Sequence, residues 1–292
     1  MKAYLRCFFE EYSYEATDAE TLLRAYETIV ADATAEALFS EALSAYESDF
    51  RIDYKKEILG RAEKIASVTQ INHYTVVLLL FISLTKHLKE LYLLRGLSMQ
   101  IYRDSVLDLK WKLEECKAVR GICGSFVGDW FPGFFSLDRF ALGRLQFEIR
   151  TMSYDYEKDG VKLEKGVSRV INVHIPRTGT PLDKESCDAA YAAARAFFAD
   201  VVGENAPFIC HSWLLFPENK VLFPARTNVY RFLSEYDVID WEFNDGEDLW
   251  RLFDTYELNP DRLPTNGALR RAYAEHLKSG GRVGCGFGVK IN

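Results

Sequence analysis

Three features that would place a protein in a well-known class are scarce or missing in this sequence. Its six cysteines form no C-x-x-C pair and have no histidine at metal-ligand spacing, which argues against a zinc site of neighbouring ligands. The longest apolar run, residues 76–82, is far shorter than the roughly 20 residues that a membrane-spanning helix needs. The 36 basic residues are outnumbered by 43 acidic ones, which argues against a surface built throughout for nucleic acid.

These absences define the expected setting of the protein. Glu10 and Glu11 follow the aromatic N-terminus before a signal-like apolar core can form. Scattered cysteines fit the reduced thiols of a cytoplasm. We therefore expect a soluble, cytoplasmic protein that binds no metal, nucleic acid or membrane. The sequence gives no indication of its oligomeric state.

What the chain does contain is ample material for a hydrophobic core. Of its 292 residues, 48% are hydrophobic and 14% are aromatic. A chain of this length forms one large domain or two of ordinary size. The composition changes near Val119, where glycine, proline and aromatic residues crowd together. We place a domain boundary there and predict two domains, 1–118 and 119–292.

The first predicted domain has helical patterning almost throughout. Apolar residues recur at helical spacing from Asp18, which we interpret as a helix cap. The most apolar segment, 73–95, is predicted to be a helix that ends at Gly96. Residues 98–117 are predicted to form one further helix. The sequence thus predicts an all-helical N-terminal domain.

The second predicted domain opens with strands. Residues 140–152 alternate between apolar and polar side chains, which predicts a strand with one face in the core. Asp159-Gly160 is a hairpin signal, and residues 168–175 are predicted to be the antiparallel partner strand. Together with a helix further on, these strands indicate a domain of the α+β class.

Two later segments are also predicted to be strands. Residues 208–216 are apolar enough to be buried on both faces, so we expect a central strand. Residues 282–291 carry glycine at every second position, and a strand face without side chains lets another group approach the backbone closely. The acidic stretch 237–257 between them is interpreted as a solvated loop and helix face, or as a surface that attracts a cationic substrate.

A loop between a strand and a helix is the first candidate binding site. Thr180 and Pro181 match a helix cap and a first helical position. Backbone amides at such a helix start favour an anion. Arg177, Thr178 and Gly179 precede the cap, and the arginine adds a charge that suits phosphate. The alternative is an ordinary connecting loop.

Polar residues on the predicted strands are the candidates for chemistry. Glu148 projects from the polar face of its strand and is a candidate general base, with an exposed sheet face of alternating charges as the alternative. His174 and His211 are candidate bases, with structural histidines as the alternative. Cys210 and Ser212 share one strand face, and either could act as a nucleophile if His174 lay nearby.

Several of these motifs together resemble a known family. The chain is similar to a bacterial family of two-part acyltransferases, which join a helical N-terminal domain to a domain like the GNAT N-acetyltransferases. The resemblance is strongest over 143–232. The motifs that carry it are Arg144 to Glu148, Val173 to Pro176, Gly179, Pro181-Leu182, Ala196 to Phe198, and Cys210 to Leu215 with Pro217.

The resemblance implies a fold, a co-substrate and a site. It implies a GNAT-like mixed-sheet α/β domain in which two strands splay apart to admit the pantetheine of acetyl-CoA or another acyl-CoA. The CoA phosphates would then rest near Ile175, Arg177, Thr178, Gly179 and Thr180. The loop between the arginine and the glycine is one residue shorter here than in the usual acetyltransferase loop.

Three functions follow from these considerations. The first is an acyl-CoA-dependent N-acyltransferase that acts on an unknown amine, with Glu148, His174 or His211 as the base. The second is a non-catalytic ligand-binding or interaction protein on the same scaffold. The third is a thiol hydrolase that uses Cys210 with His174.

Overall fold

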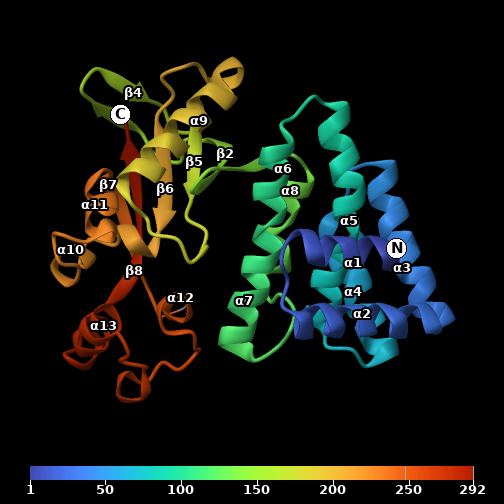
Figure 1. Cartoon of the computed structure of the whole chain (residues 1–292). Coiled ribbons are helices and arrows are strands. Elements are labelled where there is room, and N and C mark those ends of the chain that lie inside the picture. Colours follow the sequence, from blue (N-terminus) through green and yellow to red (C-terminus); the bar gives the residue numbers. More distant parts are fainter. Residues whose placement is uncertain (247, 292) are drawn as a thin grey trace. The chain divides into compact units, whose positions relative to one another are not determined.

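The computed structural model describes residues 1–246 and 248–291 and divides into two compact units, 1–140 and 141–292 (Figure 1). The first unit is helical, as predicted. Its elements are α1 (Lys2–Glu11), α2 (Ala16–Ala31), α3 (Ala33–Ser48), the π-helical turn η1 (Lys55–Leu59), α4 (Gly60–Thr69), α5 (His73–Leu94), α6 (Met99–Val106), α7 (Asp108–Arg120), the 3₁₀ turn η2 (Gly128–Trp130) and α8 (Pro132–Phe135).

Helix α5 is the centre of the first unit. Every residue from Thr75 to Thr85 is buried, and α5 contacts α1, α2, α3, α4, α6 and α7. It ends at Leu94, and Gly96 follows with a φ of +65°, so the predicted stop is confirmed. None of the helices within 1–246 and 248–291 is long and apolar enough to span a membrane.

Two details of the first unit differ from the sequence prediction. Residues 98–117 do not form a single helix, because α6 and α7 meet at Leu107. Asp18 is not a cap but lies in the first turn of α2, where its buried carboxylate accepts a bond of 2.7 Å from Nζ of Lys117. Its partner lies far away in the sequence, which local capping rules do not register.

The break between the units follows Phe140 rather than the change in composition near Val119. The aromatic residues after Val119 belong to the core of the first unit. The rings of Phe131 and Phe135 lie 4.9 and 5.0 Å from that of Phe81 on α5. The rise in glycine, proline and aromatic residues near Val119 therefore does not mark the end of the compact unit, which is decided by packing.

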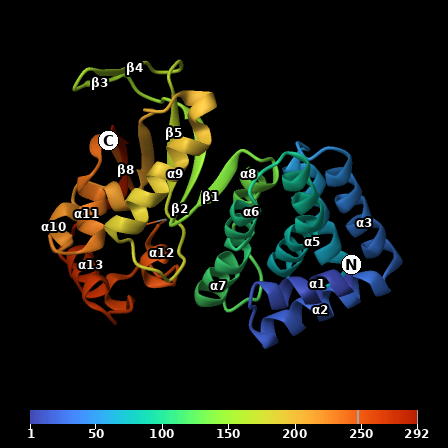
Figure 2. The ribbon, with the colours of Figure 1, turned by 45° about the horizontal axis from the view of Figure 1, so that its top comes forward.

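The second unit contains a mixed sheet covered by helices (Figures 1 and 2). Its first strand, β1, crosses the break after Phe140. The elements are β1 (Arg139–Leu142), β2 (Leu145–Thr151), β3 (Tyr156–Lys158), β4 (Val161–Leu163), β5 (Arg169–His174), α9 (Lys184–Val202), β6 (Phe208–Ser212), the 3₁₀ turn η3 (Trp213–Leu215), α10 (Asn219–Leu222), α11 (Asn228–Ser234), β7 (Asp237–Asn244), α12 (Leu249–Phe253), the 3₁₀ turn η4 (Pro260–Arg262), α13 (Ala268–Lys278) and β8 (Val283–Lys290).

The strands form a six-stranded sheet in the order β1-β2-β5-β6-β8-β7. Strands β2 and β5 are antiparallel, β5 and β6 are parallel, and β8 is antiparallel to both β6 and β7. The central position of β6 and the antiparallel partner of β2 are thus confirmed. The hairpin at Asp159-Gly160 is also confirmed, as the separate pair β3 and β4.

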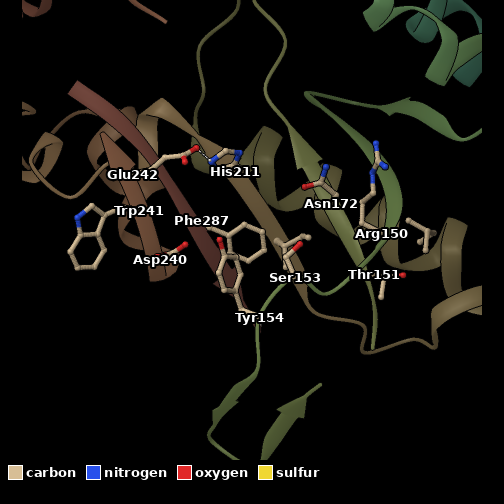
Figure 3. A pocket seen from close by; sticks show the side chains of 12 residues that line it. Arg150, Thr151, Ser153, Tyr154, Asn172, His211, Asp240, Trp241, Glu242 and Phe287 are labelled. Carbon is tan, nitrogen blue, oxygen red and sulfur yellow. Dashed lines mark ion pairs between the residues drawn. The ribbon is translucent and has the colours of Figure 1, made fainter. Parts of the chain in front are cut away.

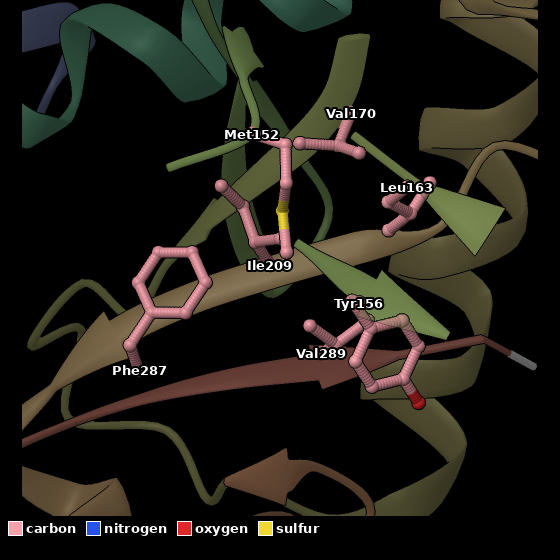
Figure 4. Close-up of a cluster of buried hydrophobic side chains, with 7 residues drawn as sticks. All are labelled: Met152, Tyr156, Leu163, Val170, Ile209, Phe287 and Val289. Carbon is pink, nitrogen blue, oxygen red and sulfur yellow. The ribbon is translucent and has the colours of Figure 1, made fainter. Parts of the chain in front are cut away.

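The two faces of the sheet are covered differently. Helix α9 packs on β2 and β5, and its Tyr191 ring lies 4.8 Å from the ring of Phe208 and 6.2 Å from that of Phe147. The opposite face carries an apolar cluster shared by the sheet and the β3–β4 hairpin (Figure 4). Its buried members are Met152, Tyr156, Leu163, Val170, Ile209, Phe287 and Val289.

The glycine face of β8 is approached by the chain itself. A Cβ atom at Gly286 would overlap the carbonyl group of Leu215, and one at Gly288 would lie 2.9 Å from Cδ1 of the same leucine. The predicted close approach is therefore confirmed, and the group that approaches is η3. This packing fixes the turn that follows β6.

Several predictions for the second unit are wrong. The predicted strand 140–152 is divided into β1 and β2, and the predicted strand 208–216 ends at Ser212, where η3 follows. Helix α9 begins at Lys184, and its cap is Asp183, whose carboxylate accepts a bond of 2.9 Å from the Ser186 amide. Thr180 and Pro181 lie before it in the loop. The first part of the acidic stretch forms the edge strand β7 rather than a loop or helix face, and residue 247 within that stretch lies outside the described residues.

Candidate active site

Strands β5 and β6 separate soon after they meet. Their parallel register contains two residue pairs, Ile171 with Phe208 and Asn172 with Ile209. Beyond these pairs, His174 still pairs with β2, and Cys210 to Ser212 still pair with β8. Within the part of the chain that the structure describes, the facing edges of β5 and β6 beyond these pairs thus lack a partner strand, and such edges bind an extended ligand readily.

A cluster of polar side chains lies next to this separation, on the face opposite α9. Oε1 of Glu148 accepts bonds from Nε2 of His174 at 2.8 Å, Nδ2 of Asn172 at 3.1 Å and Nε of Arg150 at 3.0 Å. Glu148 is 3% exposed and Gln146 is 2% exposed, so the alternative of an exposed strand face is wrong. A buried carboxylate with several donors is an organised site rather than a solvated surface.

The bond to Glu148 defines which nitrogen of His174 is basic. An ionised carboxylate can only accept hydrogen bonds, so in the neutral imidazole the proton is assigned to Nε2. Nδ2 of Asn172 lies 3.1 Å from the same nitrogen and, with this tautomer, donates to Glu148 instead. Nδ1 of His174 then has the lone pair. Glu148 would stabilise the imidazolium that forms when Nδ1 takes up a proton, so the pair is suited to general base catalysis.

A cavity of about 640 Å³ begins where β5 and β6 part (Figure 3). Asn172 and Ile209, the last residue pair of these strands, both line it. Tyr154 and Phe287 form an aromatic wall, with their ring centroids 4.9 Å apart. The cavity thus adjoins the cluster around Glu148, because Asn172 belongs to both.

His211 lies on the other side of this cavity from Asn172 (Figure 3). Its side chain is 52% exposed, and Nε2 lies 3.7 Å from Oε1 of Glu242 on β7. The structure therefore brings Glu148 and His174 into contact and gives His211 a separate acidic partner. Glu242 and Asp240 reach the cavity from the strand that the sequence prediction missed.

Hydrogen bonds from one arginine, Arg144, hold the loop after β5 in place. Arg144 donates to the carbonyl groups of Pro176 at 3.0 Å, Thr180 at 3.3 Å and Pro181 at 3.0 Å. Because these carbonyl groups all bond to a single guanidinium, the loop has a defined shape without regular secondary structure. Ile175 directly follows β5 and leads into it.

The remaining candidates of this loop are also placed. Oγ1 of Thr178 and Oγ1 of Thr180 lie 2.6 Å apart, and Gly179 has a φ of +76°, where a glycine is favoured. Arg177 forms an ion pair with Asp254, which lies directly after α12. All five predicted phosphate-binding residues thus lie in one loop, at the end of the strand that leaves β6.

Cys210 and Ser212 have structural positions. Cys210 is 1% exposed, and burial raises the pKa of its thiol to about 12. Oγ of Ser212 accepts the Leu214 amide at 3.2 Å and caps η3. A nucleophilic cysteine needs an accessible thiolate, so the geometry disfavours the thiol hydrolase. Among the residues that the structure describes, no three His, Cys, Asp or Glu side chains gather to hold a metal ion.

Sequence reasoning missed two members of the cluster, Asn172 and Arg150. Asn172 precedes His174 by two residues and therefore faces the same side of β5. Arg150 stands in the same relation to Glu148 on β2. The period of two was thus a usable signal, but only the register of β2 against β5 shows that these side chains meet.

Comparison with known proteins agrees with this architecture. The family described as the N-acyltransferase N-terminal domain matches residues 3–137, and the family described as the GNAT-like C-terminal domain matches residues 140–290. No curated protein matches the chain.

Solved structures of an acyltransferase resemble the whole chain. One is in complex with decanoyl-CoA and teicoplanin, is 20% identical and has a TM-score of 0.73, with 98% of this chain and 87% of that chain covered. A mutant acyltransferase in complex with octanoyl-CoA is also 20% identical, with a TM-score of 0.74 and the same coverage. At this identity the likeness establishes a shared fold, and the predicted combination of a helical and a GNAT-like domain is confirmed.

Proposed function

Since the chain belongs to the family of two-part N-acyltransferases with a GNAT-like C-terminal domain, we propose that it transfers an acyl group from acyl-CoA to an amine. One observation carries this proposal. The strands β5 and β6 part after two residue pairs, and the Glu148–His174 pair lies beside the point where they part. A thioester held between the strand edges would thus lie close to a base.

The proposed reaction follows from these positions. The amine nitrogen attacks the thioester carbonyl, a C–N bond forms, and the C–S bond breaks to release the CoA thiol. His174 accepts the proton of the amine at Nδ1, and Glu148 stabilises the resulting imidazolium through Nε2. Backbone amides of the parted strands stabilise the oxyanion. The proton on His174 then returns to the leaving sulfur.

His174 is the preferred base, and His211 is the second candidate. The buried carboxylate bonded to His174 orients its imidazole, whereas the side chains of His211 and of its partner Glu242 are 52% and 72% exposed. An oriented imidazole is the better base, because less reorganisation accompanies proton transfer. We assign the phosphates of the acyl donor to the loop from Ile175 to Thr180.

The acyl donor is tested first by thermal unfolding. We would titrate the protein with acetyl-, octanoyl- and decanoyl-CoA, the last two because related structures hold these chains. At about 100-fold excess over Kd, a ligand of the native state adds about 2.7 kcal/mol and raises Tm by roughly 5 °C or more. Folded protein that shows no shift with any acyl-CoA would contradict the proposal.

The alternative is a non-catalytic binding protein on the same scaffold. Saturable binding of acyl-CoA without release of CoA thiol in the presence of a range of amines would favour it. The acceptor of this chain is open, since the glycopeptide teicoplanin belongs to the related structure. A cytoplasmic location remains our prediction from the cysteines, all six of which are free thiols in the structure.

A further inference from the structure

Several backbone amides in and after the loop that follows β5 are already bonded within the chain. The amide of Thr178 donates to the carbonyl of Pro176 at 3.1 Å, and that of Thr180 donates to Oγ1 of Thr178 at 3.3 Å. Pro181 has no amide hydrogen. At the start of α9, the Ser186 amide is bonded to the carboxylate of Asp183. Because these amides are engaged, side chains would contribute to holding a phosphate at this place.

Two arginines from distant parts of the second unit converge close to this loop. Arg177 comes from the loop itself, and Arg270 comes from α13. Both bind the carboxylate of Asp254, Arg177 through Nη1 and Nη2 and Arg270 through Nη2. The distance from Nη2 to Oδ2 is 3.3 Å for Arg177 and 2.5 Å for Arg270. The two guanidinium groups are thus within reach of one small anion.

The arrangement has the charge and geometry of an anion site. Two guanidinium groups and one carboxylate leave a net charge of +1. A carboxylate and a phosphate present similar pairs of oxygens to a guanidinium fork, so one can take the place of the other. Arg270 is also fixed by bonds from Nε to the carbonyl of Leu252 at 2.8 Å and from Nη1 to Oδ1 of Asn266 at 2.9 Å. It is therefore oriented before any ligand binds.

We propose that Arg270, together with Arg177, binds a phosphate of the acyl donor, and that the carboxylate of Asp254 occupies this phosphate position until the donor binds. The inference rests on the proposed function and names a residue, Arg270, that neither sequence motif nor loop position indicates. The chemistry is that of a CoA phosphate, either the pyrophosphate or the 3′-phosphate of the nucleotide.

The test compares binding of four compounds by calorimetry: CoA, 3′-dephospho-CoA, 4′-phosphopantetheine and pantetheine. The proteins are wild type, Arg270→Gln and the control Arg271→Gln, which changes the neighbouring arginine on the same helix. We expect Arg270→Gln to weaken CoA binding by about 10- to 100-fold, the usual effect of losing a charged hydrogen bond. Arg271→Gln leaves Kd within about twofold, and Arg270→Gln leaves pantetheine unaffected.

The other compounds identify the phosphate. If the effect of Arg270→Gln disappears with 3′-dephospho-CoA, the partner is the 3′-phosphate, and if it persists there, the partner is the pyrophosphate. Equal weakening of pantetheine, or unchanged CoA binding by Arg270→Gln, would overturn the proposal. Wild type that binds no CoA at all overturns the proposed acyl donor instead, and this inference with it.

A second variant covers the case in which Arg270→Gln does not fold. Asp254→Asn removes the charge that competes with the phosphate while keeping a side chain of the same size. We expect it to bind CoA several-fold more tightly than wild type, with the gain reduced at high salt because the site is electrostatic. Unchanged or weaker CoA binding by Asp254→Asn would contradict the role given to this carboxylate.

Discussion

Nε2 of His174 lies 2.8 Å from Oε1 of Glu148, although the two residues are not opposite each other in the sheet. His174 pairs with Gln146, and Glu148 pairs with Asn172, so the contact runs diagonally between β2 and β5. The diagonal places both side chains on one face, beside the edge from which β6 departs. Register, more than residue type, produces this pair.

The first prediction concerns the tautomer of His174. In Glu148→Gln, the amide can donate to Nε2, which shifts the imidazole proton to Nδ1 and removes the base. We expect kcat for acyl transfer to fall by about 10²- to 10⁴-fold while the Kd for acyl-CoA stays within about twofold. Steady-state kinetics and calorimetry measure the two quantities.

Glu157→Gln, an exposed glutamate on β3, is the matched control and should leave kcat unchanged. If Glu148→Gln kept full activity while His211→Ala lost it, the base would be His211.

The second prediction concerns the reactivity of Cys210. Because burial raises the pKa of its thiol to about 12, we expect no alkylation of Cys210 by iodoacetamide at pH 8 in the folded protein. The exposed Cys7 should be modified under the same conditions, which provides the internal control. Peptide mass mapping measures both. Modification of Cys210 as fast as Cys7 would restore the thiol hydrolase as a candidate.

The third prediction concerns acid stability. Burial alone would raise the pKa of Asp254, but hydrogen bonds from Arg177 and Arg270 outweigh it and hold the pKa below its ordinary value of 3.8. The unfolded state thus binds more protons near this pH, so the contribution of Asp254 is present above about pH 4 and is lost as pH falls through the folded pKa.

We therefore expect the difference in Tm between wild type and Asp254→Asn to shrink from pH 5 to pH 3. Thermal melts across this range measure it. A constant difference would show that the carboxylate does not stabilise the fold through its charge.

The fourth prediction concerns the glycine face of β8. In Gly286→Ala, the new methyl group would overlap the backbone of Leu215, which has little freedom to move. Overpacking of this kind costs about 1–3 kcal/mol, so we expect Tm to fall by several degrees. Gly60→Ala, whose Cβ would lie 3.3 Å from the carbonyl of Lys55, should change Tm much less. Equal Tm values for the two variants would contradict the close packing of η3 on β8.

The sequence predicts the strands of this fold better than the ends of its helices. Alternation and the Asp159-Gly160 signal were sufficient for the hairpin and for the pairing of β2 with β5. The start of α9 was wrong because Thr180 and Asp183 are both good caps, and the bonds from Arg144 to the loop decide between them. That decision depends on a residue far away in the sequence.

The candidate site was predictable only in part, because its contacts also join residues that are far apart in the sequence. Glu148 and His174 could be named from residue type, but their contact required the register of two strands. Strand β7 was missed because its acidic residues lie on a sheet edge, where charges are tolerated and hide the usual alternation. Arg270 carries no local signal, since only folding brings α13 to Asp254.

The short register between β5 and β6 has a mechanical consequence. The sheet consists of two three-stranded ribbons, β1-β2-β5 and β6-β8-β7. Among the residues that the structure describes, two residue pairs between β5 and β6 join one ribbon to the other, so the ribbons share a short contact. If the donor binds between the ribbons, as we propose, amide protons on both facing edges should exchange more slowly with solvent while it is present. Release of the product CoA would then require its contacts with both strand edges to break. The rate of CoA release would therefore depend on how easily β5 and β6 move apart.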